Sequence, residues 1–414
     1  MLKRIAVSEL ILGMYIHEFC GSWMDHPFWK GRFLLDNERD LQRVRDSDVH
    51  EVWIDVSKGC DVAPGQASRS VEEVEAETEA RLLAADSRTP PPRASLDQEV
   101  QRALRLCSQS KAAVVEMFSD ARMGQAIALE HVAELVEEIS DSVLRHPNAL
   151  ISLARLKTSD EYTYMHSVAV CALMIALARQ LGLPEEQVRE AGEAGLLHDI
   201  GKMAIPDTIL NKPDKLTDAE FGTMRRHPEA GARMLLDCRQ ISALVLDVCL
   251  HHHEKYDGSG YPHRLAGEQI SLFARMGAVC DVYDAITSDR PYKKGWDPAD
   301  SIRKMAEWKG HFDPQVFQAF VKSVGIYPVG ALVRLESGRL GVVLEQHEKS
   351  LLTPRVKVFF SARSKLPIPQ EIIDLAKLVG HDKIIARESA DDWGFKNIEE
   401  LWSGIPAGKA SLFG

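Results

Sequence analysis

The sequence predicts a mainly α-helical protein with a small α/β domain at its N-terminal end and a small β appendage at its C-terminal end. Two observations lead to this fold class. Between Leu96 and Arg145, apolar residues recur at intervals of three and four, which is the spacing of one face of a helix. Helical patterns continue to about Val321, and after Pro328 the pattern changes to the alternation that is typical of strands.

Length and composition limit the class of protein. A chain of 414 residues exceeds the size at which one hydrophobic core usually stops growing, so about two or three domains are expected. A hydrophobic content of 45% and a charged content of 27% are those of an ordinary soluble globular protein. The net charge of -11 argues against binding of nucleic acid polymers, because phosphate binding needs a basic surface.

The cysteines and the apolar runs indicate the cellular compartment of the protein. The seven cysteines are scattered without CxxC spacing, which is typical of reduced thiols in a cytosolic chain. No apolar run reaches the roughly 18 residues of a membrane helix, and the segment after Met1 lacks the apolar region of a signal peptide. We therefore expect a cytoplasmic protein without a membrane span.

Residues 1–85 are predicted to form the α/β domain. Glu51–Val56 has the character of a strand, and the acidic segment Val71–Ala80 favours a helix. The run Thr89–Arg93 contains three consecutive prolines, which break any helix and mark the best domain boundary in the sequence. Residues 86–145 are expected to be a linker and a connecting helix.

Residues 146–330 are predicted to form the helical domain. Gly182 and Pro184 have the positions expected of residues that close one helix and open the next. Thr217 and Glu220 have the spacing of a capping box, in which each residue satisfies a backbone N–H of the other. Well-marked helix ends therefore support several separate helices in this domain.

Residues 331–414 are predicted to form the β appendage and a tail. Apolar residues alternate at Val333 and Leu335, a turn is expected at Ser337-Gly338, and the alternation resumes at Val356. The residues after 364 return to a helical but ambiguous pattern, and we see no internal repeat.

The helical domain carries an unusual density of histidine, with seven of the 15 histidines between His166 and His263. Adjacent pairs of His and Asp or of two His residues are hard to explain by packing, because each buried polar residue needs its own partner. Imidazole and carboxylate suit borderline divalent ions such as Fe, Mn, Ni or Zn, and one carboxylate can bridge two ions about 3.5–4 Å apart. The candidate ligands are His166, His198, Asp199, His227, His252, His253 and Asp281.

Each candidate ligand also has a purely structural explanation. His166 shares a helix face with apolar residues, and such a histidine is more often part of the core. The pair His198-Asp199 could cap a helix, His227 could mark a helix boundary, and the run His251–His253 could form an exposed helix face. Their occurrence together in one helical domain favours the metal hypothesis, because the separate explanations do not account for it.

Three cations accompany these candidate ligands. Lys202 follows His198 by four residues, and Arg290 and Lys293 lie in the segment 289–294. Beside a metal centre, these side chains could bind phosphate oxygens, Arg through its planar fork and Lys as a point charge. Taken alone, the segment 289–294 is equally well explained as a solvated loop.

Five short motifs occur in order along the helical domain, namely HDIGK at 198–202, HPE at 227–229, HHE at 252–254, DGSGYP at 257–262 and DVYDA at 281–285. Taken together, they resemble the HD-GYP subgroup of the HD metal-dependent phosphohydrolases. The resemblance covers roughly residues 150–330, and its motifs occur in order with sensible gaps. The β appendage looks like the usual C-terminal extension of that family, and the N-terminal segment is similar to an accessory domain that often precedes HD-GYP units.

The resemblance implies an HD-type bundle that hydrolyses cyclic di-GMP to pGpG and/or GMP, by a metal-activated hydroxide at a binuclear centre. One ion would be held by His166, His198, Asp199 and Asp281, and the other by His227, His252 and His253, with Asp199 bridging. Asp199 and Lys202 would be catalytic. The residues that would contact the substrate are Lys202, Arg290, Lys293, Tyr261 and Gly260.

Two positions near the candidate ligands are left with alternatives. Asp284, one helical turn after Asp281, is expected to orient a ligand or a cation, and its alternative role is that of a surface or capping carboxylate. Some relatives carry a glutamate four residues before the first histidine, where it is associated with a third metal. Here that position is Tyr162, and Glu161 lies one residue too early, so we expect two divalent ions such as Fe, Mn or Ni.

Two other functions remain open at this stage. One is an HD phosphohydrolase that acts on another nucleotide or cyclic dinucleotide. The other is an interaction protein that responds to cyclic di-GMP with little turnover, although the complete ligand set argues against it. A signalling partner could dock through the N-terminal domain or the loop around Tyr261, and a homodimer is left open.

Overall fold

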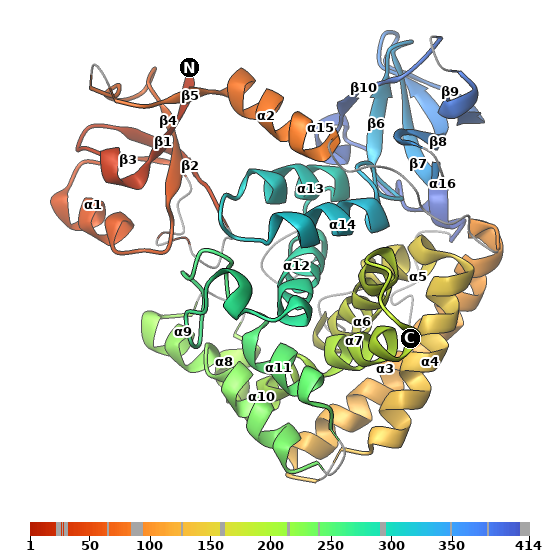
Figure 1. Ribbon diagram of the computed structural model, residues 1–414. Coiled ribbons are helices and arrows are strands. Elements are labelled where there is room, and N and C mark those ends of the chain that lie inside the picture. Colours follow the sequence, from red (N-terminus) through yellow and green to blue (C-terminus); the bar gives the residue numbers. More distant parts are fainter. Residues whose placement is uncertain are drawn as a thin grey trace. The chain divides into compact units, whose positions relative to one another are not determined.

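The chain divides into two compact units in a computed structural model, and each unit is described by itself (Figure 1). The first unit comprises residues 1–84 and 303–311, and the second comprises residues 85–302 and 312–414. Among the helices of the described residues, none combines the length and the apolar character that crossing a bilayer requires. The structure describes residues 1–21, 26, 28, 32–63, 66–83, 94–125, 127–157, 162–212, 216–238, 241–289, 295–347, 350–378 and 381–405.

The first unit is built on a five-stranded antiparallel sheet with the strand order β3-β2-β4-β1-β5. The predicted strand at Glu51–Val56 is confirmed as β4, and the predicted helix at Val71–Ala80 is confirmed as part of α2. Asn37 caps α1, because its side chain accepts a hydrogen bond of 2.8 Å from the backbone N–H of Asp40. The elements are β1 (Leu2–Ala6), β2 (Tyr15–Phe19), β3 (Phe33–Leu34), α1 (Glu38–Arg45), β4 (Glu51–Asp55), β5 (Arg69–Ser70) and α2 (Val71–Leu83).

A buried arginine attaches the segment 303–311 to this sheet. Arg4 on β1 is 2% exposed, and its guanidinium lies 2.7 Å from the carboxylate of Glu51. The same guanidinium donates to the backbone oxygen of Glu307 at 2.9 Å. A charge-assisted contact of this kind is stronger than a neutral hydrogen bond, so Arg4 holds the two stretches of the first unit together.

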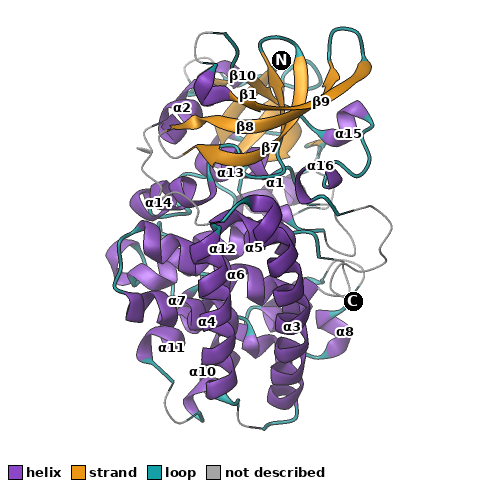
Figure 2. Cartoon of the chain, turned by 90° about the vertical axis from the view of Figure 1, so that its right-hand side faces the viewer, coloured by secondary structure: helices purple, strands orange, loops and turns teal. Residues whose placement is uncertain are grey.

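The helices of the second unit surround α6, which packs against α3, α4, α5, α7, α12 and α14. Figure 2 shows α3, α4 and α6 running side by side. The predicted apolar face of α4 is confirmed, because Val132, Val136, Ile139 and Val143 are buried. The helices are α3 (Leu96–Arg122), α4 (Leu129–Arg145), α5 (Pro147–Ala154), α6 (Tyr162–Gln180), α7 (Glu185–Leu197), α8 (Asp207–Leu210), α9 (Asp218–Met224), α10 (His227–Leu236), α11 (Ala243–His251), α12 (Leu272–Thr287) and α14 (Pro314–Val324), together with α13 (Pro298–Glu307), of which residues 303–307 belong to the first unit.

The predicted helix ends are also found. Gly182, at a φ of +72°, lies between the end of α6 and the start of α7. The capping box at α9 is complete: the backbone N–H of Glu220 donates to Thr217 Oγ1 at 3.3 Å, and the backbone N–H of Thr217 donates to the Glu220 carboxylate at 2.7 Å. Gly182 therefore lies just beyond the end of α6, and the capping box marks the start of α9 at Asp218.

The C-terminal part of the second unit is a five-stranded antiparallel sheet with the order β10-β6-β7-β8-β9. The helical pattern after residue 364 was a wrong prediction for 366–374 and 384–387, which are strands. Their partners explain the error: β9 is an edge strand, where Pro367 and Pro369 are tolerated, and β10 pairs with β6, which lies far away in the sequence. The elements are β6 (Leu332–Leu335), β7 (Arg339–His347), β8 (Ser350–Ser361), β9 (Leu366–Asp374), β10 (Ile384–Arg387), α15 (Ala390–Trp393) and α16 (Glu400–Ser403).

Candidate metal centre

The seven side chains that the sequence nominates as metal ligands lie together in the second unit. Six of the seven residues are no more than 5% exposed, so the explanation of His251–His253 as an exposed helix face is wrong for His252. The last residue of α7 is Leu197, and the last of α11 is His251, so two adjacent pairs of ligands lie where a helix ends. The seven are His166 on α6, His198 and Asp199 after α7, His227 at the start of α10, His252 and His253 after α11, and Asp281 on α12.

Asp199 lies between two groups of ligand atoms, with one carboxylate oxygen toward each group. Its Oδ2 lies 3.5 Å from Nε2 of His166 and 3.3 Å from Nε2 of His198. Its Oδ1 lies 3.2 Å from Nε2 of His227 and 3.9 Å from Nε2 of His252. A carboxylate in this position has the geometry to bridge two ions.

The first group contains His166, His198 and Asp199, whose ligand atoms all lie within 4.8 Å of one another. Asp281 adds a second carboxylate to it, because its Oδ1 lies 3.0 Å from Nε2 of His166 and 3.9 Å from Nε2 of His198. This half of the centre therefore combines imidazole nitrogens with carboxylate oxygens.

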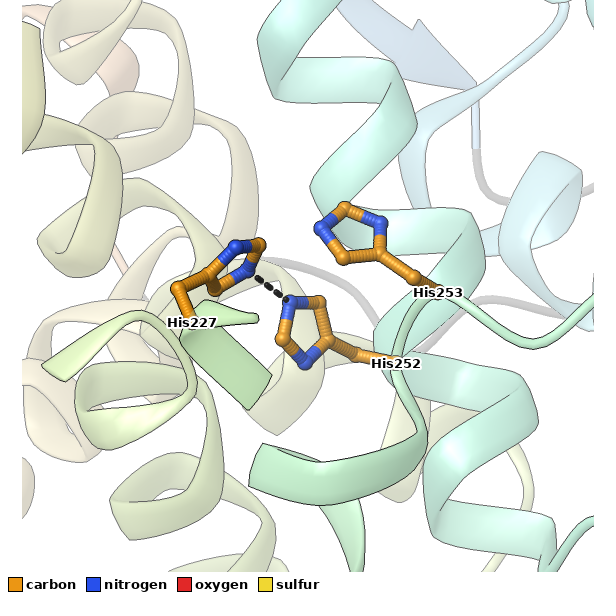
Figure 3. Close-up of side chains that lie close together, drawn as sticks. All are labelled: His227, His252 and His253. Atoms are coloured by element: carbon orange, nitrogen blue, oxygen red, sulfur yellow. Dashed lines mark hydrogen bonds between the residues drawn. The ribbon is translucent and has the colours of Figure 1, made fainter. Parts of the chain in front are cut away.

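The second group contains three imidazoles, those of His227, His252 and His253, which converge in Figure 3. Nε2 of His227 lies 3.3 Å from Nε2 of His252, and the ring centroids of His252 and His253 are 4.2 Å apart. Their ligand atoms also lie within 4.8 Å of one another, which is close enough for one ion to contact all three.

The imidazole rings of His198, His227 and His252 are held by their Nδ1 atoms, so that Nε2 faces the centre. Nδ1 of His198 lies 2.8 Å from the backbone oxygen of Gly195, and Nδ1 of His227 lies 2.8 Å from that of Met224. Nδ1 of His252 lies 3.0 Å from the backbone oxygen of Cys249. A carbonyl acceptor places the proton on Nδ1 and leaves the Nε2 lone pair free, as metal-binding histidines require.

Two buried atoms show that these residues fit a metal ion. Nε2 of His198 and Oδ1 of Asp199 make no well-aligned hydrogen bond within the described part of the chain, although ligand atoms lie 3.2–3.3 Å away. Buried polar atoms are normally satisfied, so these two atoms, which lie among imidazole nitrogens and carboxylate oxygens, fit a bound cation.

The charge states of His252 and Asp199 suit a metal ion. Burial, followed by the neighbouring imidazoles of His198 and His227, lowers the pKa of His252 to about 3. Burial works to raise the pKa of Asp199, but Lys202 and His198 outweigh it and hold the pKa of this carboxyl well below its usual range. Neutral imidazole and ionised carboxylate are the forms in which these groups bind metals.

Lys202 is placed at this centre, in the half that contains His166. Its Nζ donates to Oδ2 of Asp199, and its side chain is 21% exposed. A lysine that touches both the solvent side and the shared carboxylate can meet the oxygen of an incoming anion.

The loop Gly258–Pro262 lies against the second group. The Tyr261 ring stacks on the His253 ring at 4.7 Å between centroids, and the guanidinium carbon of Arg225 lies 4.3 Å from the Tyr261 centroid. Buried Glu254 fixes the chain beyond the loop by accepting from the backbone N–H of His263 at 2.6 Å. Gly260 is required because a Cβ there would lie 2.5 Å from the Cα of Glu254.

Asp284 lies behind the first group rather than on the surface. It is 3% exposed, and its Oδ2 lies 2.6 Å from Nδ1 of His166. The explanation of Asp284 as a surface carboxylate is therefore wrong. The sequence reasoning missed two residues nearby, namely Lys157, which contacts Asp284, and Arg225, which lies two residues before His227.

Several predicted site residues lie outside the part of the chain that the structure describes. They are Arg290 and Lys293, proposed for phosphate binding, and Glu161, considered for a third metal. Tyr162 is the first residue of α6, and its side chain is also outside the description. The proline run of Thr89–Arg93 falls outside it as well.

Comparison with known proteins gives the family. Residues 136–316 match the HD domain family, and residues 2–132 match a domain of unknown function, DUF3391. Over 414 residues, which are 100% of this chain and 98% of the relative, the chain is 69% identical to cyclic di-GMP phosphodiesterase PA4108 of Pseudomonas aeruginosa.

Two other relatives match over shorter stretches. Cyclic di-GMP phosphodiesterase response regulator RpfG of Xanthomonas campestris pv. campestris is 46% identical over 151 residues, which are 35% of this chain and 39% of the relative. The 3'3'-cGAMP-specific phosphodiesterase 2 of Vibrio cholerae is 37% identical over 162 residues, which are 39% of this chain and 31% of the relative.

A helical domain with buried imidazoles and carboxylates that can hold metal ions defines the class of metal-dependent HD-domain proteins. Within that class, identity over the full length of a relative sets the family. The chain belongs to the HD-GYP family of cyclic di-GMP phosphodiesterases.

Proposed function

We propose that this protein hydrolyses cyclic di-GMP to pGpG and/or GMP at a binuclear metal centre. The observation that carries the proposal is the position of Asp199, with one oxygen toward His166 and His198 and the other toward His227 and His252. The relative that is 69% identical is named for the same phosphodiesterase activity.

The proposed ligand sets follow the two groups of the centre. His166, His198, Asp199 and Asp281 would hold one ion, and His227, His252, His253 and the other oxygen of Asp199 would hold the second. Divalent Fe, Mn or Ni suits this mixture of nitrogen and oxygen donors. Bound there, the pair of ions would supply Lewis-acid polarisation of the phosphodiester and an acidified water as nucleophile.

The chain's own residues would bind and orient the phosphodiester. Lys202, beside Asp199 and partly exposed, is proposed to stabilise the charge that develops on a phosphoryl oxygen. Arg290 and Lys293 are proposed to bind the phosphates of the substrate as well. Tyr261 and Gly260 are proposed to contact the substrate beside the second ion, because the Tyr261 ring stacks on His253.

A second candidate substrate is 3'3'-cGAMP, which one of the relatives is named for. Both cyclic dinucleotides present the same phosphodiester chemistry to the metal centre, so a preference must come from contacts to the bases. We favour cyclic di-GMP, because the relative that matches the whole chain is named for that substrate. A binding protein with little turnover is the third alternative.

One assay separates these alternatives. The full-length protein, purified without oxygen and loaded with Mn²⁺ or Fe²⁺, is incubated with cyclic di-GMP, 3'3'-cGAMP or pGpG, and the products are separated by chromatography. We expect pGpG and/or GMP from cyclic di-GMP, at a higher kcat/KM than for 3'3'-cGAMP. Binding of cyclic di-GMP without product would contradict the proposal, and faster cleavage of 3'3'-cGAMP would favour the second candidate.

Three further assignments belong to this proposal. The protein would act in the cytoplasm, a signalling partner would dock through residues 1–85 or through the loop that contains Tyr261, and the domain bounds would be those expected from the sequence. Size measurement in solution would decide whether the protein is a homodimer.

A further inference from the structure

A lysine buried behind the metal centre has no role in the proposed mechanism. Lys157 lies just beyond the end of α5 and is 2% exposed. Its Nζ lies 2.8 Å from each carboxylate oxygen of Asp284, 2.6 Å from Ser288 Oγ and 3.2 Å from the backbone oxygen of Ala154. The ammonium is therefore held by protein oxygens instead of water.

Asp284 connects this ammonium to a proposed metal ligand. Its Oδ2 lies 2.6 Å from Nδ1 of His166, and Nε2 of the same ring lies 3.0 Å from Asp281 and 3.5 Å from Asp199. Lys157, Asp284 and His166 thus form a continuous chain of hydrogen bonds and ion pairs, which runs from the end of α5 through α12 to α6. The chain ends at the atom that would bind the ion.

We propose that Lys157 is a positioning residue that sets the affinity of the first ion by holding Asp284 against His166. The inference rests on the proposed function only in taking His166 as a metal ligand. The physical reason is that a buried carboxylate without a compensating cation is strongly unfavourable. With Lys157 present, Asp284 is held as a fixed acceptor for the His166 Nδ1–H, and Nε2 keeps its lone pair toward the centre.

The other imidazoles are held by a different kind of acceptor than His166 is. His198, His227 and His252 are each held by a backbone carbonyl, which is neutral and fixed by its own helix. The acceptor for His166 is instead the charged side chain of Asp284. Without further contacts, this side chain could rotate away or accept from another donor. Lys157 contacts both carboxylate oxygens of Asp284 at 2.8 Å, and Ser288 Oγ donates to Oδ1 at 3.4 Å, which holds the carboxylate with Oδ2 2.6 Å from His166 Nδ1.

The first test is the variant Lys157→Met, which removes the charge and keeps most of the stem. Mn²⁺ binding to the metal-free full chain is measured by calorimetric titration, and circular dichroism reports the fold. We expect the first ion to bind about 10- to 100-fold more weakly, the loss typical of removing a group that supports a ligand from behind, while the second ion keeps its affinity. Lys212→Met is the matched control, because Lys212 also pairs with a carboxylate, that of Glu220 at 2.7 Å, outside the metal centre.

A second variant covers the case in which Lys157→Met does not fold because Asp284 is left uncompensated. The double variant Lys157→Met with Asp284→Asn removes both charges, and an uncharged pair is tolerated better than a lone buried charge. We expect this variant to fold and still to bind the first ion about 10- to 100-fold more weakly, because His166 has lost its charged acceptor. Wild-type affinity for both ions in either folded variant would overturn the proposal.

The metal readout keeps this inference separate from the proposed function. Failure of the wild-type protein to cleave cyclic di-GMP, with Lys157→Met still weakening one ion, would overturn only the proposed substrate. Equal weakening of both ions, together with a lower melting temperature than that of Lys212→Met, would show that Lys157 stabilises the fold generally and would overturn the positioning role.

Discussion

The two halves of the metal centre share Asp199 but surround it with different ligands. Around Asp199 Oδ2, two imidazoles stand with a second carboxylate, that of Asp281. Around Oδ1, the proposed set is completed by three imidazoles, and Asp281 lies farther away there, with its Oδ2 3.7 Å from Nδ1 of His253. The first half therefore carries more negative charge, and we expect it to hold a hard divalent ion more tightly than the second half does.

The halves also differ in what supports them. Behind the first half lies the buried pair of Asp284 and Lys157, whereas the rings of His227 and His252 are held by backbone carbonyls. The second half in turn contacts the Tyr261 ring, which stacks on His253. We therefore expect the first half to hold its ion more firmly, while the second half lies beside the loop that contains Tyr261.

The largest effect is expected from the residue that both halves share. Asp199→Asn keeps the shape of the side chain and removes the negative charge, so neither half retains its bridging ligand. We expect phosphodiesterase activity to fall by more than about 1000-fold, as when a residue on which the whole reacting centre depends is removed. Metal content should fall for both ions, while circular dichroism shows the helical domain intact.

His131→Ala is the control for this experiment, because His131 is an exposed histidine on α4 that contributes no ligand to either group. It should keep full activity and metal content. An Asp199→Asn protein with two tightly bound ions would contradict the bridging assignment.

The next effect separates the halves from each other. His227→Ala removes a ligand of the second half only, so we expect this variant to retain one of two ions after dialysis and to lose most activity.

Asp281→Asn removes the carboxylate that distinguishes the first half, and the tighter of the two binding steps should weaken. Elemental analysis and calorimetric titration measure both outcomes, and equal loss of both ions in His227→Ala would show that the halves are not independent.

A smaller effect is expected at the loop beside the second half. Arg225→Ala removes the guanidinium that lies 4.3 Å from the Tyr261 ring. A cation–π contact at a partly exposed site is worth about 0.5–1 kcal/mol, which corresponds to about a two- to fivefold rise in KM. Steady-state kinetics with cyclic di-GMP measures the change, and metal content should stay at the wild-type level.

Arg226→Ala provides the matched comparison, since Arg226 is the adjacent arginine and is exposed. If both variants changed KM equally, the effect would come from net charge near the centre and not from the contact with Tyr261.

The smallest effect concerns a turn outside both halves. Thr217→Ala removes the side-chain oxygen that caps α9, and loss of such a cap costs about 1 kcal/mol in the free energy of unfolding. Urea denaturation should show this loss, with kcat/KM and metal content unchanged. A fall in activity would mean that the start of α9 supports the centre in a way that its capping box does not explain.

The ligands of the centre could be predicted from the sequence because they occur in short local motifs. His198 and Asp199 are adjacent, as are His252 and His253, and each pair lies where one helix ends. Two adjacent side chains that can bind a metal, at the end of a helix, are hard to explain by packing alone. The capping box at Thr217 was predictable for the same reason, since both of its partners lie within four residues.

Lys157 could not be predicted in this way. It is a lone lysine after a helix, and its partner Asp284 lies 127 residues further along the chain. No periodicity or spacing connects the two, because the contact forms only when the folded chain brings these distant residues together. The strands β9 and β10 were missed for a related reason, since pairing with distant strands decided their structure and the local pattern did not.

The most direct test of the account is the electron paramagnetic resonance spectrum of the protein loaded with two equivalents of Mn²⁺. A carboxylate that bridges two ions about 3.5–4 Å apart brings them close enough for their spins to couple. We predict the spectrum of a coupled pair in the wild-type protein and the six-line spectrum of isolated Mn²⁺ in Asp199→Asn. An uncoupled spectrum in the fully loaded wild-type protein would contradict the claim that Asp199 joins two metal ions in one centre.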